Sequence, residues 1–343
     1  MYLHALTNHV PEDAYTQSEC WDIAKSSGIL EQLKPRSAYL LERLLTNPNG
    51  IAKRHFAVPD ISRLFNRSAE ELNNAFQESA PKLAGKALMK ALDQAALKAD
   101  QLDALVVCTC TGYLCPGLTS YVAEQLGLPS NCYLQDLVGL GCGAAIPSIR
   151  SATGIANMQP DAKIAVIAIE LCSAAFYIDD DPGVLVSLCL FADGASASIW
   201  SGSPPTNGAA WKVGDFDTLH LPEKRETLRF TNKEGFLKNQ LDVSVPEHAA
   251  QAVKTLYDRQ PEPMDVIAHG GGRDVINSIR KHMPDKDLTE TTCILEQFGN
   301  LSSPSVLFAL ESRLREIPDQ TEPLWLTSFG AGFAAHSCTL KRV

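Results

Sequence analysis

The sequence lacks the features that would make it a nucleic-acid-binding or membrane protein. Its 343 residues hold 30 Lys and Arg against 40 Asp and Glu, a net charge of −10, and the basic residues are dispersed. This balance argues against nucleic-acid binding. No apolar run approaches the roughly 20 residues needed to cross a bilayer, and the segment Met1 to Tyr15 has neither the basic start nor the apolar core of a signal peptide. We therefore expect a cytoplasmic protein without a membrane span.

The sequence also lacks cysteine spacings that are typical of disulfide frameworks or zinc sites. Most of its ten cysteines lie in apolar, strand-like runs, which indicates reduced and buried thiols. Cys108 and Cys110 are separated by one residue, and no second pair or histidine cluster completes a zinc site. The sequence predicts no metal centre.

Apolar runs that alternate with amphipathic segments indicate the fold class. The runs Leu102–Cys108, Lys163–Ile169 and Met264–Ala268 are typical of strands that are buried on both faces. Helical periodicity marks Leu118–Leu126 and Pro246–Arg259 between them. This alternation predicts an α/β fold with central sheets.

Three local expectations can be checked against the structure. Residues 1–60 look irregular, apart from a short helical stretch near Ser37–Leu45. Ser68–Asp100 reads as two helices, the first of which opens with a capping box at Ser68. Further on, Ser303 is predicted to be the N-cap of a helix whose first residue is Pro304.

The most informative stretch surrounds Cys142. It follows a strand-like run and precedes a helical segment, Ala144–Met158, so the cysteine lies on a turn at a helix N-terminus. Such a position favours a thiolate over a thiol. The flanking Gly141 and Gly143 allow another group to approach the backbone closely. The alternative is a small buried cysteine in a tight turn, which is the usual role of a free cysteine.

Two further turns carry residues that could work with a cysteine nucleophile. His269 follows a predicted strand and begins the run His-Gly-Gly-Gly, and Asn300 lies in a turn before a helix. An imidazole can hold a cysteine as thiolate. A histidine and an amide can together bind the oxygen of a thioester or of an enolate. For His269 the alternative is a histidine that closes a glycine-rich turn, and for Asn300 it is an Asx turn. The occurrence of Cys142, His269 and Asn300 in three such turns favours a shared site.

The second half of the chain repeats the strand–helix order of the first. Met264–Ala268 resembles Leu102–Val107 in pattern, and a helix follows each after a turn. We therefore predict two similar halves, residues 1–205 with the nucleophilic cysteine and residues 206–343 with the histidine and asparagine. The active site is expected where the halves meet.

Taken together, these motifs resemble those of the type III polyketide synthases, the chalcone and stilbene synthase family of the thiolase superfamily. The resemblance runs from about Pro48 to the end of the chain. It is carried by Val107–Gly112 with Pro116-Gly117, Gly141-Cys142, Phe191–Gly194, His269–Gly272, Gly299–Ser303 and Phe329–Gly332.

The resemblance implies a thiolase-like αβαβα five-layered fold, a homodimer, acyl-CoA and malonyl-CoA as substrates, and no bound cofactor. Cys142 matches the family's acyl-accepting nucleophile, and His269 and Asn300 match its catalytic histidine and asparagine. The implied reaction is an iterative decarboxylative condensation of malonyl-CoA onto an acyl-CoA starter held on Cys142, followed by cyclisation or release.

The same resemblance assigns residues around the substrate. Phe191 matches the phenylalanine between the coenzyme A tunnel and the cavity. Cys110, Cys172 and Ser302 fall at cavity-lining positions, where side-chain volume tunes starter and product. A second cavity phenylalanine has no secure match in Phe236–Pro246.

The residues that hold the coenzyme A phosphates stay open. Arg43, Lys53 and Arg54 lie in the family's phosphate-binding region, and solvated surface charge explains them equally well. The chain also has His269-Gly-Gly-Gly where the family has His-Pro-Gly-Gly, and Ser328–Gly332 lacks a family proline. Both changes loosen turns beside the site and indicate a divergent, bacterial member.

Three alternatives remain at this point. A single-condensation ketoacyl synthase of the initiating type would have His-Gln-Ala-Asn where this chain has His269–Gly272. A degradative thiolase would need a second cysteine in a Cys-x-Gly turn, and Cys338 is followed by Thr-Leu. A non-catalytic partner subunit would have little reason to keep all three candidate residues. The starter, the number of extensions and the product cannot be read from the sequence.

Overall fold

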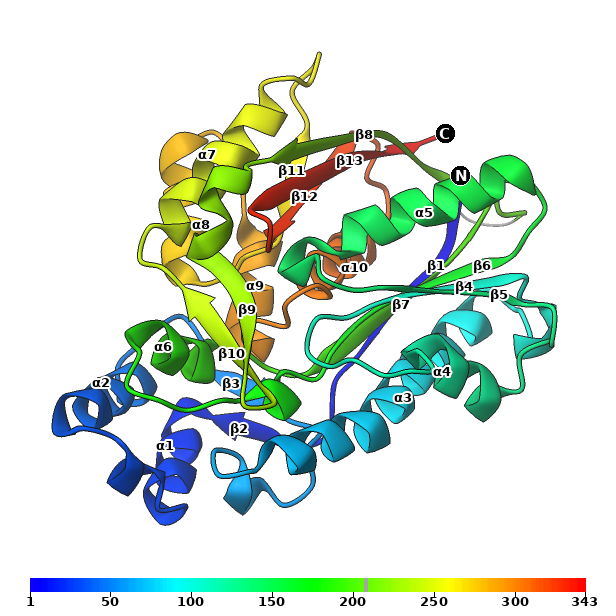
Figure 1. Cartoon of the computed structure of the whole chain (residues 1–343). Helices are drawn as coiled ribbons and strands as arrows, with labels where there is room; N and C mark the ends of the chain where they lie inside the picture. Colours follow the sequence, from blue (N-terminus) through cyan, green and yellow to red (C-terminus); the bar gives the residue numbers. More distant parts are fainter. Residues whose placement is uncertain (207–208) are drawn as a thin grey trace.

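The computed structural model describes residues 1–206 and 209–343, and its central feature is one mixed sheet of nine strands (Figure 1). The strand order is β11-β12-β13-β8-β1-β7-β6-β4-β5, with two-stranded pairs β9–β10 and β2–β3 outside it. The strands are β1 (Tyr2–His9), β2 (Ala14–Thr16), β3 (Lys53–His55), β4 (Ala104–Cys108), β5 (Tyr133–Leu137), β6 (Ile164–Glu170), β7 (Gly194–Ser201), β8 (Trp211–His220), β9 (Leu228–Lys233), β10 (Phe236–Leu241), β11 (Asp265–Ala268), β12 (Leu324–Gly330) and β13 (Ala334–Arg342).

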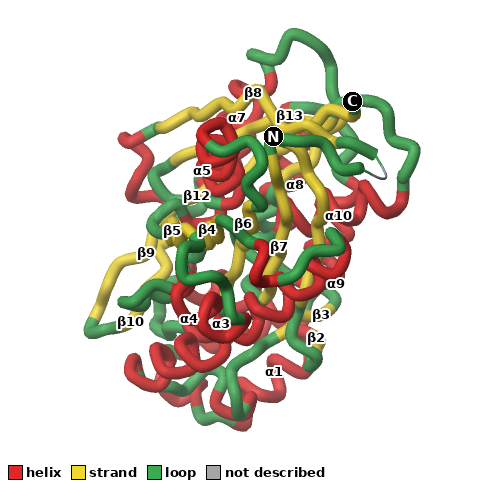
Figure 2. Tube along the Cα trace, turned by 90° about the vertical axis from the view of Figure 1, so that its right-hand side faces the viewer, coloured by secondary structure: helices red, strands yellow, loops and turns green. Residues whose placement is uncertain are grey.

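Some helices cover the outer faces of the sheet, and others lie inside the fold between its strands (Figure 2). They are α1 (Gln17–Ser26), α2 (Pro35–Thr46), α3 (Ala69–Gln94), α4 (Leu118–Leu126), α5 (Ala145–Met158), α6 (Pro182–Leu190), α7 (Val245–Tyr257), α8 (Arg273–His282), α9 (Thr289–Phe298) and α10 (Ser305–Glu316). None of the helices in the described ranges has the length and apolar character needed to cross a bilayer.

The nine strands fall into two groups that meet at one narrow contact. Strands β1, β4, β5, β6 and β7 come from the first part of the chain, and β8, β11, β12 and β13 come from the second. The groups join where Tyr2 and Leu3 of β1 pair with Lys212 and Trp211 of β8. The boundary predicted after residue 205 lies in the β7–β8 connection and stays a prediction.

The apolar runs of the sequence make strands whose two faces enter different cores. In β6, Ile167 and Ile169 face the core beneath α3, whereas Val166 and Ala168 face the core around α5. Successive side chains of a strand point to opposite faces. A strand buried on both sides must therefore be apolar at every position, which explains the unbroken run in the sequence.

Three cores separate five layers of secondary structure. The middle core holds Ile149 of α5 and Leu307 of α10 between the two groups of strands, and Figure 1 shows α5 lying between β12–β13 and β4–β6. An outer core joins α3 to the first group of strands, and another joins α7 and α8 to the second. The predicted αβαβα arrangement is confirmed.

Three local expectations were wrong, and in each case tertiary packing decided the outcome. Residues 1–60 are not irregular: they form β1, a central strand that pairs with β7, together with α1 and α2. The helical stretch expected near Ser37–Leu45 is confirmed, since it lies within α2. The two helices expected after Ser68 form a single helix, α3, because Pro81 and its alanine neighbours are buried against the sheet. The capping box expected at Ser68 is present. Helix α10 begins at Ser305 with Pro304 at the N-cap position, because the Ser303 hydroxyl donates to Glu170 at 2.6 Å.

Candidate active site

Three turns from distant parts of the chain line one cavity of about 380 Å³. Cys142 lies in a single 3-10 turn, Gly141–Gly143, between β5 and α5. His269 directly follows β11, and Asn300 lies between α9 and α10. The structure thus brings together the three residues that the sequence selected as nucleophile and oxyanion-binding groups, and their catalytic roles remain a prediction.

The glycines around Cys142 are required by another part of the backbone. A Cβ at Gly141, whose φ is +57°, would lie 2.9 Å from the nitrogen of Ala331. A Cβ at Gly330 would lie 2.6 Å from the nitrogen of Gly143, and a real Cβ atom essentially never makes non-bonded contacts this short. The Ser328 hydroxyl also donates to the Gly143 carbonyl at 3.0 Å. The loop between β12 and β13 is therefore the group that approaches the cysteine turn.

The Cys142 thiol is held by a hydroxyl. Ser302 Oγ donates to Cys142 Sγ at 3.2 Å. Burial raises the pKa of Cys142 to about 12, the Ser302 hydrogen bond opposes this, and the negative charge of Glu170 adds to it. In the described part of the chain no hydrogen bond joins Cys142 to His269, so the predicted partnership rests on their sharing one cavity.

The His269 side chain is enclosed by protein and neutral. It is only 1% exposed, and its ring centre lies 5.0 Å from that of Phe329. Its Nδ1 is buried and has no hydrogen-bond partner among the described residues. Burial lowers the pKa of His269 to about 4, because an uncompensated imidazolium is costly in a dry site. The neutral ring can accept a proton from a thiol.

The Asn300 amide is fixed by a hydrogen bond to the His269 loop and by one within its own loop. Its Nδ2 donates to the Gly271 carbonyl at 2.6 Å, and its Oδ1 accepts from the Ser302 backbone N–H at 2.8 Å. An amide nitrogen carries two hydrogens, so one N–H remains for a ligand. Asn300 therefore ties the His269 loop to the Ser302 loop and keeps one donor free.

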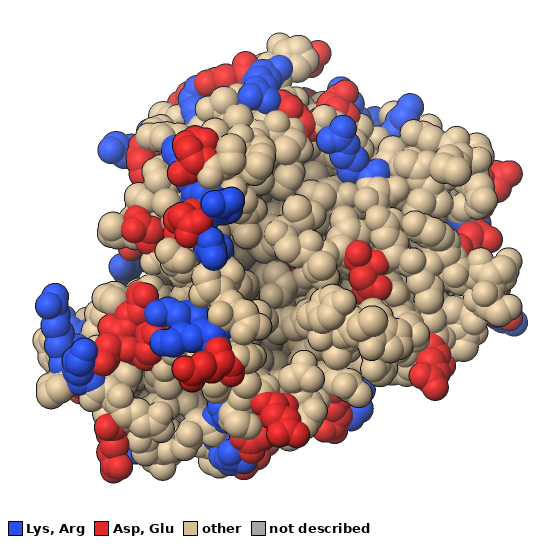
Figure 3. Space-filling view, in the orientation of Figure 1, with Lys and Arg blue, Asp and Glu red and all other residues tan. Residues whose placement is uncertain are grey.

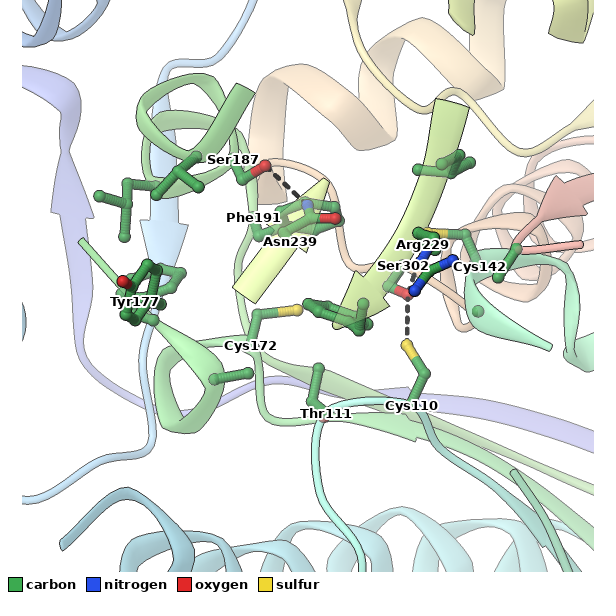
Figure 4. A pocket seen from close by; sticks show the side chains of 18 residues that line it. Cys110, Thr111, Cys142, Cys172, Tyr177, Ser187, Phe191, Arg229, Asn239 and Ser302 are labelled. Carbon is green, nitrogen blue, oxygen red and sulfur yellow. Dashed lines mark hydrogen bonds between the residues drawn. The ribbon is translucent and has the colours of Figure 1, made fainter. Parts of the chain in front are cut away.

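Phe191 lines both the outer cavity and a smaller inner one of about 50 Å³, as do Cys142 and Leu228. Its backbone forms a β-bridge with Asn300, which fixes the ring beside the candidate residues. Cys110, Cys172 and Ser302 all line the inner cavity, and their effect on starter and product remains a prediction. Figure 4 shows Cys110, Ser302 and Cys142 grouped at one end of this cavity and Tyr177 at the other.

Asn239 lines the inner cavity and was missed at the sequence level. It lies on β10, is buried, and donates from Nδ2 to Ser187 Oγ at 2.6 Å. The segment that gave no secure match to a phenylalanine is the second strand of the β9–β10 hairpin, and Asn239 is the residue that faces the cavity there. In the sequence of β10, the alternation of polar and apolar residues is too weak to show which face of the strand is buried.

Glu170 is a second residue that the sequence reasoning missed. This buried carboxylate ends β6, and its pKa is raised by burial. It accepts hydrogen bonds from the Cys110 backbone N–H at 3.0 Å and the Ser303 hydroxyl at 2.6 Å, and the Ser302 hydroxyl lies 3.3 Å away. The single Ser302 proton can therefore go to Glu170 or to Cys142. An acidic residue at the end of a wholly apolar strand was the available signal.

Comparison with known proteins identifies the family of this chain. A family model described as "FAE1/Type III polyketide synthase-like protein" matches residues 1–213. The 3,5-dihydroxyphenylacetyl-CoA synthase of Amycolatopsis balhimycina is 30% identical over 324 residues, which cover 90% of this chain and 83% of that protein. The chain belongs to the type III polyketide synthase family. It is an enzyme of the acyltransferase class.

Two further similarities extend the comparison. The 1,3,6,8-tetrahydroxynaphthalene synthase of Streptomyces coelicolor is 26% identical, with 95% of this chain and 88% of that protein covered. The crystal structure of such a synthase from the same organism matches with a TM-score of 0.87 and 24% identity, over 100% of this chain and 99% of that one, which supports the fold. Neither an initiating ketoacyl synthase nor a non-catalytic partner is favoured by these matches.

The basic residues near the family's phosphate-binding region do not line the outer cavity. Arg54 is fully buried, and its guanidinium donates to Gln17 Oε1 and to the Leu188 and Phe191 carbonyls. It thereby supports the backbone at Phe191. Arg43 and Lys53 are exposed, and neither contributes to the cavity wall.

The Glu170–Ser302–Cys142 arrangement predicts opposite effects of two substitutions. Ser302→Ala removes a hydrogen bond that favours the thiolate, and should slow alkylation of Cys142 by iodoacetamide at neutral pH about tenfold. Glu170→Gln removes a negative charge that raises the pKa of Cys142, and should therefore speed the alkylation of Cys142. The rate is measured across neutral and alkaline pH by mass spectrometry of the Cys142 peptide in folded variants. Shifts in the same direction would contradict this account.

Proposed function

We propose that the enzyme condenses malonyl-CoA onto an acyl-CoA starter, with Cys142 as the acyl carrier and His269 and Asn300 as the oxyanion-binding pair. The observation that carries this proposal is the cavity that all three side chains line. Cys142 also lies three residues before Ala145, the first residue of α5, whose N-terminal end favours negative charge. The 24% identical crystal structure supports only the fold, so the roles rest on this chain's own geometry.

In the first step the acyl group moves from coenzyme A to the cysteine. The neutral His269 imidazole takes the Cys142 proton, and the thiolate attacks the thioester carbonyl. Burial alone disfavours each charge, and an imidazolium and a thiolate within the shared cavity would offset this cost for one another. The tetrahedral intermediate collapses with release of the coenzyme A sulfur, which receives the proton from His269. The free N–H of Asn300 helps to hold the oxyanion.

In the second step the malonyl thioester supplies a carbon nucleophile. Loss of carbon dioxide leaves the electron pair on the adjacent carbon as an enolate, whose oxygen is bound by His269 and Asn300. The enolate carbon attacks the Cys142 thioester and expels the Cys142 thiolate, so the chain grows by two carbons on coenzyme A. Transfer back to Cys142 allows another cycle, and cyclisation or hydrolysis ends the series. All of these steps use side chains alone, and we propose that no resident cofactor takes part.

We further propose that the protein is a homodimer joined through β5. This strand ends the nine-stranded sheet, so one side of its backbone is unpaired. It also carries exposed apolar side chains: Tyr133 is 55% exposed, and Leu134 and the nearby Val138 are exposed as well. A second copy of β5 would form hydrogen bonds with the unpaired backbone groups of this edge and would cover these exposed side chains. The segment that leads to Cys142 follows directly and would be stiffened.

The cytoplasm is the proposed location. All ten cysteines are free thiols, including Cys338, which is wholly buried in β13 and whose pKa is raised by burial. Free thiols persist in a reducing compartment. The nucleophile proposed for the reaction also depends on staying reduced.

Two variants should separate the two steps of the proposed reaction. Asn300→Ala should lower decarboxylation of malonyl-CoA by about a hundred- to a thousandfold, because an oxyanion donor is lost, while acyl transfer onto Cys142 partly persists. Cys142→Ala should abolish elongation and retain decarboxylation. Release of labelled carbon dioxide and mass spectrometry of products measure both. A parent enzyme that forms no elongated product from any acyl-CoA starter would refute the function.

The dimer proposal predicts the effect of a charge on the β5 edge. Leu134→Arg should yield a monomer in sedimentation experiments, because it places a charge in the proposed interface. Met158→Arg, on an exposed apolar residue at the end of α5, is the matched control and should remain a dimer. A monomeric parent, or a folded Leu134→Arg variant that stays dimeric, would be incompatible with this interface.

A further inference from the structure

The outer cavity has an inner end at the candidate catalytic residues and an outer end that is open to solvent. The outer end is formed by Leu44 of α2, Asn49 from the following loop, Val243 after β10, and Arg273 at the start of α8. Val243 and Arg273 are both exposed. A thioester that reaches Cys142 through this opening leaves the other end of its carrier beside these residues.

Among the described residues that line this cavity, Arg273 has the one cationic side chain. The acidic side chains there are Asp242 and Asp274. Figure 3 shows a hollow near the centre of this face with side chains of both signs along one side of it. Because the chain as a whole carries a net charge of −10, attraction of a phosphorylated substrate depends on local positive charge.

The Arg273 side chain is held in place over the loop that precedes β3. Its stem lies against Gly50, where an added Cβ would be 3.3 Å from Arg273 Cβ. Its Nη1 donates to the Pro48 carbonyl at 2.7 Å, and its Nε lies 3.5 Å from Asp274 Oδ1. A guanidinium has five N–H groups, and Nη2 makes no hydrogen bond to a described residue. The Arg273 guanidinium is thus held through Nη1 and Nε, and its Nη2 group is left to bind an anion.

The backbone at the same place adds to the positive potential. Arg273 is the first residue of α8, a helix of ten residues, and Gly272 at its N-cap has no side chain to satisfy the first N–H groups. Such N–H groups and the helix dipole favour phosphate. Gly270, Gly271 and Gly272 connect this helix directly to His269.

We propose that Arg273 binds the phosphate groups of the acyl-CoA and malonyl-CoA substrates at the mouth of the outer cavity. This inference rests on the proposed function and names the residue that recognises the carrier. It also explains how a chain whose Arg54 is buried inside the fold retains a contact for coenzyme A. Arg273 is a substrate-positioning residue, separate from the groups that carry out the condensation.

The test compares thioesters with and without phosphates. Arg273→Ala should raise KM for malonyl-CoA about tenfold relative to KM for the malonyl thioester of N-acetylcysteamine, because an exposed charge-assisted contact is partly screened by solvent. Arg273→Lys should recover part of the loss. Lys281→Ala, which removes an exposed charge at the far end of α8, is the matched control and should behave as the parent.

Equilibrium binding keeps this inference separable from the proposed reaction. Arg273→Ala should weaken binding of free coenzyme A about tenfold and leave binding of pantetheine, which has no phosphate, unaffected. If the parent binds coenzyme A in this Arg273-dependent way but forms no condensation product, only the proposed function fails. Equal coenzyme A affinities of parent and Arg273→Ala, or equal losses for coenzyme A and pantetheine, would overturn the assignment of Arg273.

Discussion

The site depends on a backbone-to-backbone contact between the two parts of the chain. Gly330, at the end of β12, lies so close to the Cys142 turn that a Cβ there would be 2.5 Å from the Leu140 carbonyl. Both the turn and the loop after β12 must therefore present glycine where they meet. This contact fixes the position of Cys142 relative to β11 and β12, and hence relative to His269.

Burial sets the electrostatic character of the site. It raises the pKa of Cys142 and of Glu170 and lowers that of His269, so each group is neutral or costly to charge alone. A charged Cys142 thiolate and a charged His269 imidazolium become favourable only when they form together. The Ser302 hydroxyl connects the Cys142 thiol to the Glu170 carboxylate. An incoming thioester that draws the proton and the electron pair apart would find the compensating partners already in place.

The turns at Cys142, His269 and Asn300 and the α/β layers could be predicted from the sequence, because glycine brackets and unbroken apolar runs are local signals. For Glu170 the sequence marks only an acidic residue at the end of an apolar strand, and its role could not be predicted, since that role depends on donors far away in the chain, such as Cys110 and Ser303. The central strand β1 was missed for a similar reason. Its burial comes from neighbours β7 and β8, which are about 200 residues away in sequence.

The central claim is that Cys142 carries the growing chain, and peptide mapping tests it most directly. The enzyme is incubated with a labelled acyl-CoA starter, quenched in acid, digested and analysed by mass spectrometry. The account predicts one acyl group on the peptide that contains Cys142, and none on that peptide in Cys142→Ala. An acyl group on the peptide of Cys110 or Cys172 instead, or undiminished acylation of the Cys142→Ala protein, would contradict it.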